Sequence, residues 1–293
     1  MTMSPAPVSN PNSIWREAFR IPRRHLNDLI PAIMISFAVM TILIYFAAGM
    51  VIQLVGSLAT IKGNGGGVPS FPSGIIPLYF GFILVVTVQW FYFIVYFSKR
   101  ELKRYGQPEL GVGRFFYSFG MRLLVMLIIM CVMFVGIALS AIVGAVLGKS
   151  GISSAVSALL MFAAQLVYYF LLIRFILVGV LAANKIKPVL DTSWKLSQGN
   201  WWRLLGTLLL VSILIDLAFI PFGIIGGILM AVMHRGGGGS SGFVALLSVG
   251  IGLLITVIMV IYAGYETGAC RILIDEKRQS DPAFLRMTES GKP

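Results

Sequence analysis

Apolar residues gather in six long stretches of the chain, which shorter polar segments separate. The stretches cover residues 29–58, 75–98, 119–148, 154–183, 204–233 and 243–270. A helix needs about 20 mainly apolar residues to cross the hydrocarbon core of a bilayer, and each stretch reaches that length. The pattern predicts an all-α integral membrane protein of six transmembrane helices, some of them tilted or extended beyond the bilayer.

Aromatic residues recur at helical spacing in the polar segments on one side of these stretches. Rings on one helix face and charges on the other are typical of helices that lie in the membrane interface. The groups are Trp15, Ala18 and Phe19; Val112, Phe115, Phe116 and Phe119; and Leu190, Trp194 and Trp201, which Trp202 and Arg203 extend. We expect these residues to form an interfacial surface for lipid or a partner.

The third group carries signals for its own helix boundaries. Pro188 suits the first turn of a helix, and Gly199 suits its C-terminal end. Asn200 is then placed to cap the next helix.

A threefold repeat of helical hairpins is consistent with this arrangement. Arg122-Leu123-Leu124 aligns with Arg203-Leu204-Leu205, with aromatic residues upstream of both, and the Trp15 segment with Arg24 resembles a divergent first copy. Such repeats are common in membrane folds. The alternative is that any helix pair begins with basic and aromatic interface residues.

Charge adds an orientation. Of the 23 Lys and Arg, Lys62, Lys149 and Arg235 lie in the loops on one side and Arg174 lies inside a stretch, while the others lie on the opposite side. Basic residues favour the cytoplasmic side, so both termini are expected there. We predict a cytoplasmic N-terminal amphipathic segment (1–28), a six-helix transmembrane domain (29–270) and a cytoplasmic tail (271–293). The same bias accounts for the net charge of +12 without nucleic acid.

No motif for catalysis, a cofactor or a metal is present in the sequence. It has no HExxH, GxSxG or nucleotide loop, and Cys131 and Cys270 do not form a CxxC pair. His25 and His234 fall on opposite predicted sides of the membrane. We therefore expect a protein that is not an enzyme and that has no cofactor and no metal.

Two charged residues lie deep in the apolar stretches: Arg174 in the fourth and Asp216 in the fifth. A charge at such depth costs at least about 2.5–3.5 kcal/mol on insertion scales. We predict that they form an intramembrane ion pair that fixes helix packing; the alternative is a proton or substrate relay. Glu266, nearer the end of the sixth stretch, is expected to reach the interface or to pair with a basic residue, and Arg271 is close by.

Small residues at four-residue spacing predict close helix packing. They are Gly136, Ser140, Gly144 and Gly148 in the third stretch and Gly223 and Gly227 in the fifth, after Pro221. Packing within one chain is favoured over self-association.

The segment from Asp191 to Leu205, DTSWKLSQGNWWRLL, is the most distinctive in the chain. It resembles the S-W-x-L-x-x-G-x-W-x-x-L segment of bacterial six-helix membrane proteins related to the membrane domain of glycerophosphoryl diester phosphodiesterases. The resemblance implies a multi-pass protein of the bacterial inner membrane with a link to the envelope or to lipids. It transfers no catalytic residue, since the phosphodiesterase chemistry of such fusions belongs to a separate soluble barrel.

These observations favour a non-enzymatic accessory or scaffold protein that associates with anionic lipid, a membrane-protein partner or a second copy of itself. The alternative is a transporter or channel for a small or lipid-like solute, with Arg174 and Asp216 in its pathway.

Overall fold

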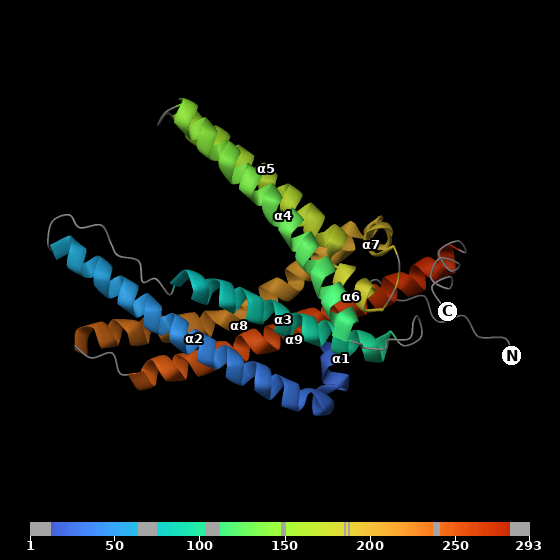
Figure 1. Cartoon of the computed structure of the whole chain (residues 1–293), viewed down its shortest axis with the longest axis horizontal. Coiled ribbons are helices and arrows are strands. Elements are labelled where there is room, and N and C mark those ends of the chain that lie inside the picture. Colours follow the sequence, from blue (N-terminus) through green and yellow to red (C-terminus); the bar gives the residue numbers. More distant parts are fainter. Residues whose placement is uncertain are drawn as a thin grey trace. The chain divides into compact units, whose positions relative to one another are not determined.

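The computed structural model describes residues 13–63, 75–102, 112–147, 151–184, 186, 188–236 and 241–281. All regular structure in these ranges is helical (Figure 1). The helices are α1 (Ser13–Arg24), α2 (Leu26–Gly63), α3 (Ile75–Glu101), α4 (Val112–Leu147), α5 (Gly151–Phe175), α6 (Val178–Ala183), α7 (Val189–Ser197), α8 (Trp201–Gly236) and α9 (Ser241–Ser280).

Five of the described helical segments are long and apolar enough to cross a membrane. They are Leu26–Gly49, Gly81–Glu101, Phe115–Val146, Ser154–Ala183 and Val244–Ser280. A sixth is counted if α7 and Trp201–Leu217 of α8, which bend by 89° at their junction, form one span. The chain is therefore a multi-pass helical membrane protein, while the exact number of six spans stays a prediction.

The helices divide between two compact units. Unit 1 holds residues 1–17, 94–208 and 265–293, and unit 2 holds residues 18–93 and 209–264. Helices α4 to α7 lie wholly in unit 1, whereas α1, α3, α8 and α9 each contribute one part to each unit.

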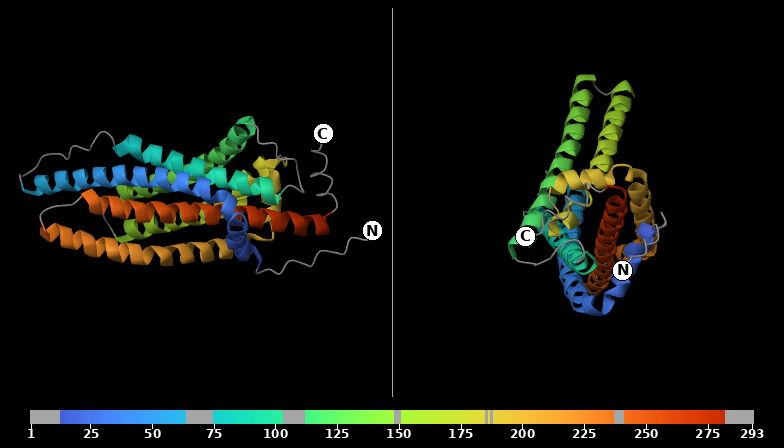
Figure 2. Two further views of the ribbon diagram at one scale, coloured as in Figure 1. Left: turned by 90° about the horizontal axis from the view of Figure 1, so that it is seen from below. Right: turned by 90° about the vertical axis from the view of Figure 1, so that its right-hand side faces the viewer.

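Within unit 1, α4 and α5 form a long hairpin and lie side by side along their length (Figure 2). Gly136 of α4 faces Ala164 of α5 so closely that a β-carbon at position 136 would overlap the Ala164 side chain. Nearby, the Ser157 hydroxyl donates to the Ser140 carbonyl at 3.3 Å. Small residues thus bring the two backbones together, because no side chain separates them.

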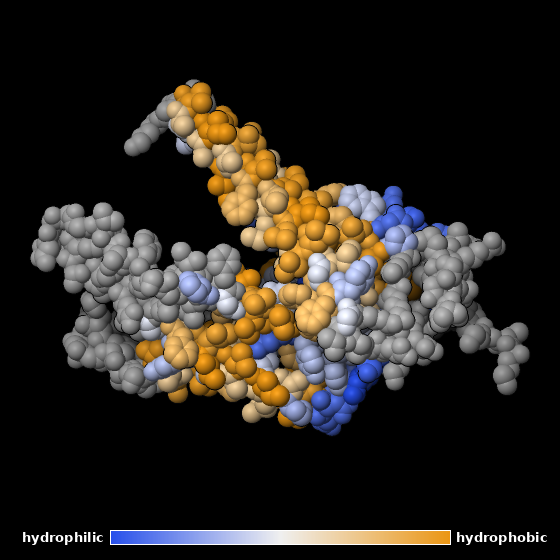
Figure 3. Space-filling model, in the orientation of Figure 1, coloured by the Kyte–Doolittle hydropathy of each residue, from blue (hydrophilic) through white to orange (hydrophobic). Residues whose placement is uncertain are grey.

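The outer faces of this hairpin are apolar. Side chains such as Phe134, Ile142 and Leu159 are 58–67% exposed, and hydrophobic residues cover the visible face of the hairpin in Figure 3. Exposed apolar area of this extent suits lipid as the surrounding solvent. Gly148 lies outside the described part of the chain. Gly223 and Gly227 lie in α8, but the structure does not describe what surrounds them.

Two local expectations need correction. The aromatic group from Val112 to Phe119 does not form a separate helix, because it is the first part of the continuous helix α4. Asn200 does not act through its side chain on α8: its amide donates back to the Leu196 carbonyl at the end of α7, at 3.4 Å.

The predicted boundaries of α7 are confirmed. The helix begins directly after Pro188 and ends before Gln198, and Gly199 follows with φ of 83°. This is the left-handed conformation that glycine adopts without steric cost. The chain therefore turns sharply into α8 at this point.

The fourth apolar stretch is interrupted. Helix α5 ends at Phe175, and a two-residue turn precedes the short, fully buried α6. Arg174 consequently lies in the last turn of α5 and not within an unbroken helix.

Unit 2 is held by close approaches of α9 and by polar contacts between helices. A β-carbon on Gly264 would lie 2.7 Å from the Ala18 carbonyl oxygen of α1. The Ser36 hydroxyl donates to Gln89 at 3.0 Å, and Ser212 and Tyr262 share a hydrogen bond of 2.8 Å. A side-chain amide that bonds across helices is a common arrangement in lipid.

Adding one methyl group to the hairpin tests its packing. We expect Gly136→Ala to lower the free energy of unfolding by about 1–3 kcal/mol, the usual cost of overpacking. Gly144→Ala is the matched control, because a β-carbon there meets nothing within 4 Å. Thermal unfolding in detergent measures both, and equal stability of the two variants would contradict the packing described.

Candidate functional site

The C-terminal part of α9 carries charges at a regular spacing. Glu266, Arg271 and Glu276 are five residues apart. Five residues turn an α-helix by about 140° beyond one full turn, so the three side chains leave the helix in three different directions. Each direction meets a different part of unit 1.

Glu266 forms the most buried of these contacts. It is inaccessible to solvent, and its two oxygens accept hydrogen bonds of 2.6 and 2.7 Å from the guanidinium of Arg122 on α4. Such a two-point contact is the strongest geometry available to an arginine and a carboxylate. Both residues lie within candidate membrane spans, where an unpaired charge is costly.

Arg271 reaches the opposite way. Its guanidinium lies 2.8 Å from a carboxylate oxygen of Glu17 on α1 and contacts Glu101 at the end of α3. One cation therefore joins the unit 1 parts of α1, α3 and α9.

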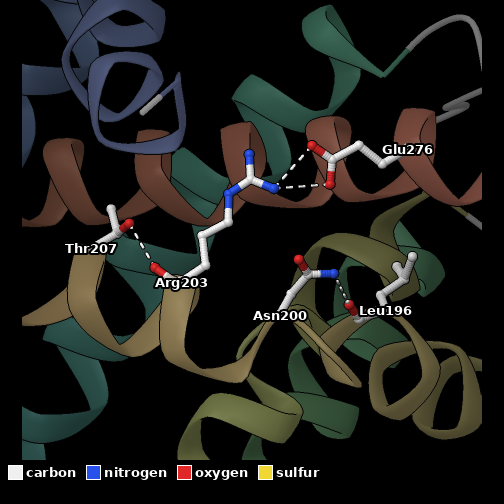
Figure 4. Close-up of polar contacts among 5 residues, drawn as sticks. All are labelled: Leu196, Asn200, Arg203, Thr207 and Glu276. Carbon is white, nitrogen blue, oxygen red and sulfur yellow. Dashed lines mark hydrogen bonds and ion pairs between the residues drawn. The ribbon is translucent and has the colours of Figure 1, made fainter. Parts of the chain in front are cut away.

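Glu276 completes the set. Both of its oxygens lie 2.9 Å from one guanidinium nitrogen of Arg203, near the start of α8 (Figure 4). The next turn of α8 is closed by Thr207, whose hydroxyl donates to the Arg203 carbonyl at 2.8 Å. Every glutamate in the described part of the chain thus takes part in an arginine pair that involves α9.

The neighbouring residue Tyr265 strengthens the junction between α8 and α9. Its ring is fully buried, and its hydroxyl donates to the Leu204 carbonyl at 2.9 Å. Arg203 and Leu204 are therefore both bound by α9, one through charge and one through the backbone.

A second cluster surrounds Arg174. Its guanidinium lies 4.6 Å from the ring centre of Trp194 and 5.1 Å from that of Phe170, within cation–π distance of both. It also donates to the Trp194 carbonyl and the Ser197 hydroxyl at 3.3 and 3.4 Å. In return, the Ser193 hydroxyl donates to the Arg174 carbonyl at 2.7 Å, which satisfies the end of α5.

The predicted partners belong to different units, Arg174 to unit 1 and Asp216 to unit 2. Their pairing stays a prediction. The contacts within unit 1 show that Arg174 also anchors α7 to the end of α5.

We call residues 189–207 the α7–α8 corner. Its three tryptophans have different surroundings: Trp194 packs on Phe170 and Phe175, Trp201 packs on Phe170, and Trp202 contacts the Trp201 ring but is 77% exposed. The other predicted surface residues lie at separate places. Trp15 is on α1 with Arg16 over its ring, Phe115 and Phe119 stack on α4, and Phe116 is 62% exposed.

A polar recess of about 180 Å³ lies between the α7–α8 corner and the end of α9. Its polar lining residues are Lys195, Gln198, Asn200, Glu276, Lys277 and Ser280. Figure 4 shows part of each wall, with Asn200 and Leu196 on one side and Glu276, which Arg203 binds, on the other.

Unit 2 contains a larger groove of about 430 Å³ between α2 and α3. Its lining is mainly apolar and includes Ile35, Val88 and Phe93. Its polar lining residues include Asp28 and the hydrogen-bonded Ser36 and Gln89.

Within the described residues, no group of three or more His, Cys, Asp or Glu side chains could hold a metal ion. Comparisons with models of protein families, with curated proteins and with solved structures found no match.

The sequence predicts Trp194, Trp201 and Arg203 as surface residues, whereas Arg122 stands out in it only through the alignment of the two hairpin segments. Glu266 pairs with a basic residue, which was one of the two expectations for it. The partner of Glu266 is Arg122 and not Arg271, which is nearer in the sequence. The signal that could have found the pair was Glu266 itself. The chain has only 11 acidic residues, and one inside an apolar stretch needs a cation on a neighbouring helix.

Removing one member of the buried pair leaves the other charge uncompensated. We expect Arg122→Leu or Glu266→Gln alone to cost about 3–5 kcal/mol of stability, and the double variant to recover much of it. Thermal unfolding in detergent measures the cycle.

Asp191→Asn is the control, since its pair with Lys195 is half-exposed, with oxygen and nitrogen 2.7 Å apart, and is worth about 0.3–0.5 kcal/mol. Additive losses in the Arg122 and Glu266 variants would show that the two side chains do not depend on each other.

Proposed function

We propose that this chain is a non-enzymatic accessory or scaffold protein of a membrane, which acts by binding anionic lipid at the α7–α8 corner. The observation that carries this proposal is the exposure of aromatic and basic side chains on one short segment. Trp202 is 77% exposed, Trp194 is 38% exposed, and the Lys195 side chain is 45% exposed. Indole rings prefer the headgroup region, and lysine is attracted to anionic lipid.

The distribution of charge supports the same proposal. The four described glutamates are neutralised by Arg122, Arg203 and Arg271 inside unit 1. The chain carries a net charge of +12, so the excess of positive charge is left for the polar segments. Near an anionic leaflet each such residue contributes about 1 kcal/mol of attraction.

The asymmetry of Lys and Arg supports a cytoplasmic position for this corner and for both termini. The resemblance of the Asp191–Leu205 segment supports a bacterial inner membrane and a relation to the six-helix family. In fusions of that family the phosphodiesterase chemistry belongs to a separate soluble domain, which agrees with a role in association.

The repeat hypothesis gains one structural argument. Arg122 and Arg203, which occupy equivalent places in the two aligned segments, each bind a glutamate of α9. Equivalent residues with equivalent partners are what duplicated hairpins around a common helix would retain.

Lipid retention tests the proposed function. We expect the protein purified in mild detergent to keep anionic lipid in preference to zwitterionic lipid, and Trp202→Ala to weaken this retention about tenfold, because burying a large apolar side chain is worth about 1.5–3 kcal/mol. Leu159→Ala, at an exposed apolar position on α5, is the control.

Mass spectrometry of the purified protein reports bound lipid and bound protein together. A stoichiometric protein partner without selective lipid would favour association with protein. Purification of a solitary protein without preferred lipid would contradict the proposal.

A transporter for a lipid-like solute is the second candidate, and the groove of about 430 Å³ in unit 2 favours it. A double-mutant cycle at Arg174 and Asp216 separates the two candidates. If the residues form a structural pair, Arg174→Leu and Asp216→Asn each lower thermal stability by about 3–5 kcal/mol, and the double variant recovers much of the loss. Single variants as stable as the wild type would show that there is no such pair and would favour a solute pathway.

A further inference from the structure

We propose that the polar recess between the α7–α8 corner and the end of α9 binds one phosphoryl group, with Lys195 and Lys277 as its cationic ligands. This inference rests on the proposed function and specifies the chemical group that the corner would recognise. It starts from the recess itself, which has a volume of about 180 Å³ and a mainly polar lining.

The recess offers hydrogen-bond donors on facing walls. Lys195 and Gln198 belong to the α7–α8 corner, and Lys277 belongs to the last turn of α9. A lysine ammonium carries three donors and a glutamine amide carries two. A phosphoryl group has several acceptor oxygens, so donors that converge from two helices match its shape and charge.

The carboxylate in the lining does not oppose an anion. Glu276 has both oxygens 2.9 Å from Arg203, so its charge is compensated within the wall of the recess (Figure 4). The same pair joins the start of α8 to the end of α9 beside the recess. Arg203 thus acts as a positioning residue.

The two lysines have competing partners that are weak. Lys195 lies 2.7 Å from Asp191 and Lys277 lies 3.8 Å from Asp281, and all four side chains are 38–47% exposed. Exposed pairs at this spacing contribute little and are screened by salt. A phosphoryl group can therefore replace Asp191 at Lys195 and Asp281 at Lys277 without loss of a buried contact.

The position of the recess favours a lipid headgroup as the source of the phosphoryl group. Trp202 lies two residues after Asn200, which lines the recess, and its side chain is 77% exposed. If its ring lies at the headgroup level, the recess lies at the depth of lipid phosphates. A soluble phosphate is the other source of the same chemistry.

The experiment compares the full-length wild-type protein with Lys195→Gln/Lys277→Gln in nanodiscs that contain equal amounts of phosphatidylglycerol and phosphatidylcholine. Lipid that stays bound after detergent extraction is quantified by native mass spectrometry. In the double variant we expect the amount of bound phosphatidylglycerol to fall about fivefold for each lysine replaced. Lys99→Gln, an exposed lysine of unit 1 outside the recess, should retain it.

A second arm uses inorganic phosphate with the protein in detergent, measured by calorimetry. Binding of phosphate to the wild type but not to the double variant, without any preference for phosphatidylglycerol, would assign the recess to a soluble anion and would contradict the proposed function. Thermal unfolding of each variant confirms that it folds.

Equal retention of phosphatidylglycerol by the wild type and the double variant would overturn the recess as the binding site while leaving the proposed function intact. If neither phosphatidylglycerol nor inorganic phosphate binds the wild type selectively, both proposals are wrong.

Discussion

The contact between Glu266 and Arg122 is the constraint on which the organisation of unit 1 depends. A carboxylate in a candidate membrane span is tolerated only with a cation beside it, and the two-point contact supplies that cation with little freedom of geometry. The position of α4 against α9 is thereby defined. Arg271 and Glu276, which leave α9 in other directions, bind parts of α1, α3 and α8 in the same manner. The end of α9 consequently contacts four other helices of the chain within unit 1, through charged pairs as well as through its buried apolar residues.

The shape of the α7–α8 corner depends on its contacts with the end of α9. Gly199 makes the sharp turn, and the two residues that begin α8 after the tryptophans, Arg203 and Leu204, are bound to α9. On the other side, Arg174 and Ser193 join α7 to the end of α5. The corner is therefore fixed at both ends, while Trp202 on it is exposed. A rigid support beneath an exposed aromatic surface suits a protein that works by association.

Hydrogen bonds between neutral side chains contribute to the packing of unit 2. Examples are Ser36 with Gln89 and Ser212 with Tyr262. Neutral bonds between helices contribute about 0.6 kcal/mol on average in lipid. Close backbone approaches at Gly252 and Gly264 add van der Waals contact there.

The sequence by itself determined the helical, multi-pass character of the protein, because the length and hydrophobicity of a span are local properties of the chain. It also determined the start of α7 and the turn at Gly199, since proline and glycine act on their own backbone. Only the tertiary structure decided which charges meet. Glu266 and Arg122 are 144 positions apart, and nothing in either segment specifies the other. The break after Phe175 and the aromatic surroundings of Arg174 were likewise decided by packing, because Trp194 and Ser193 reach α5 only after the chain has turned through α6. Hydrophobic periodicity records which residues face lipid, whereas the partner of a buried charge depends on helices that come together from distant parts of the chain.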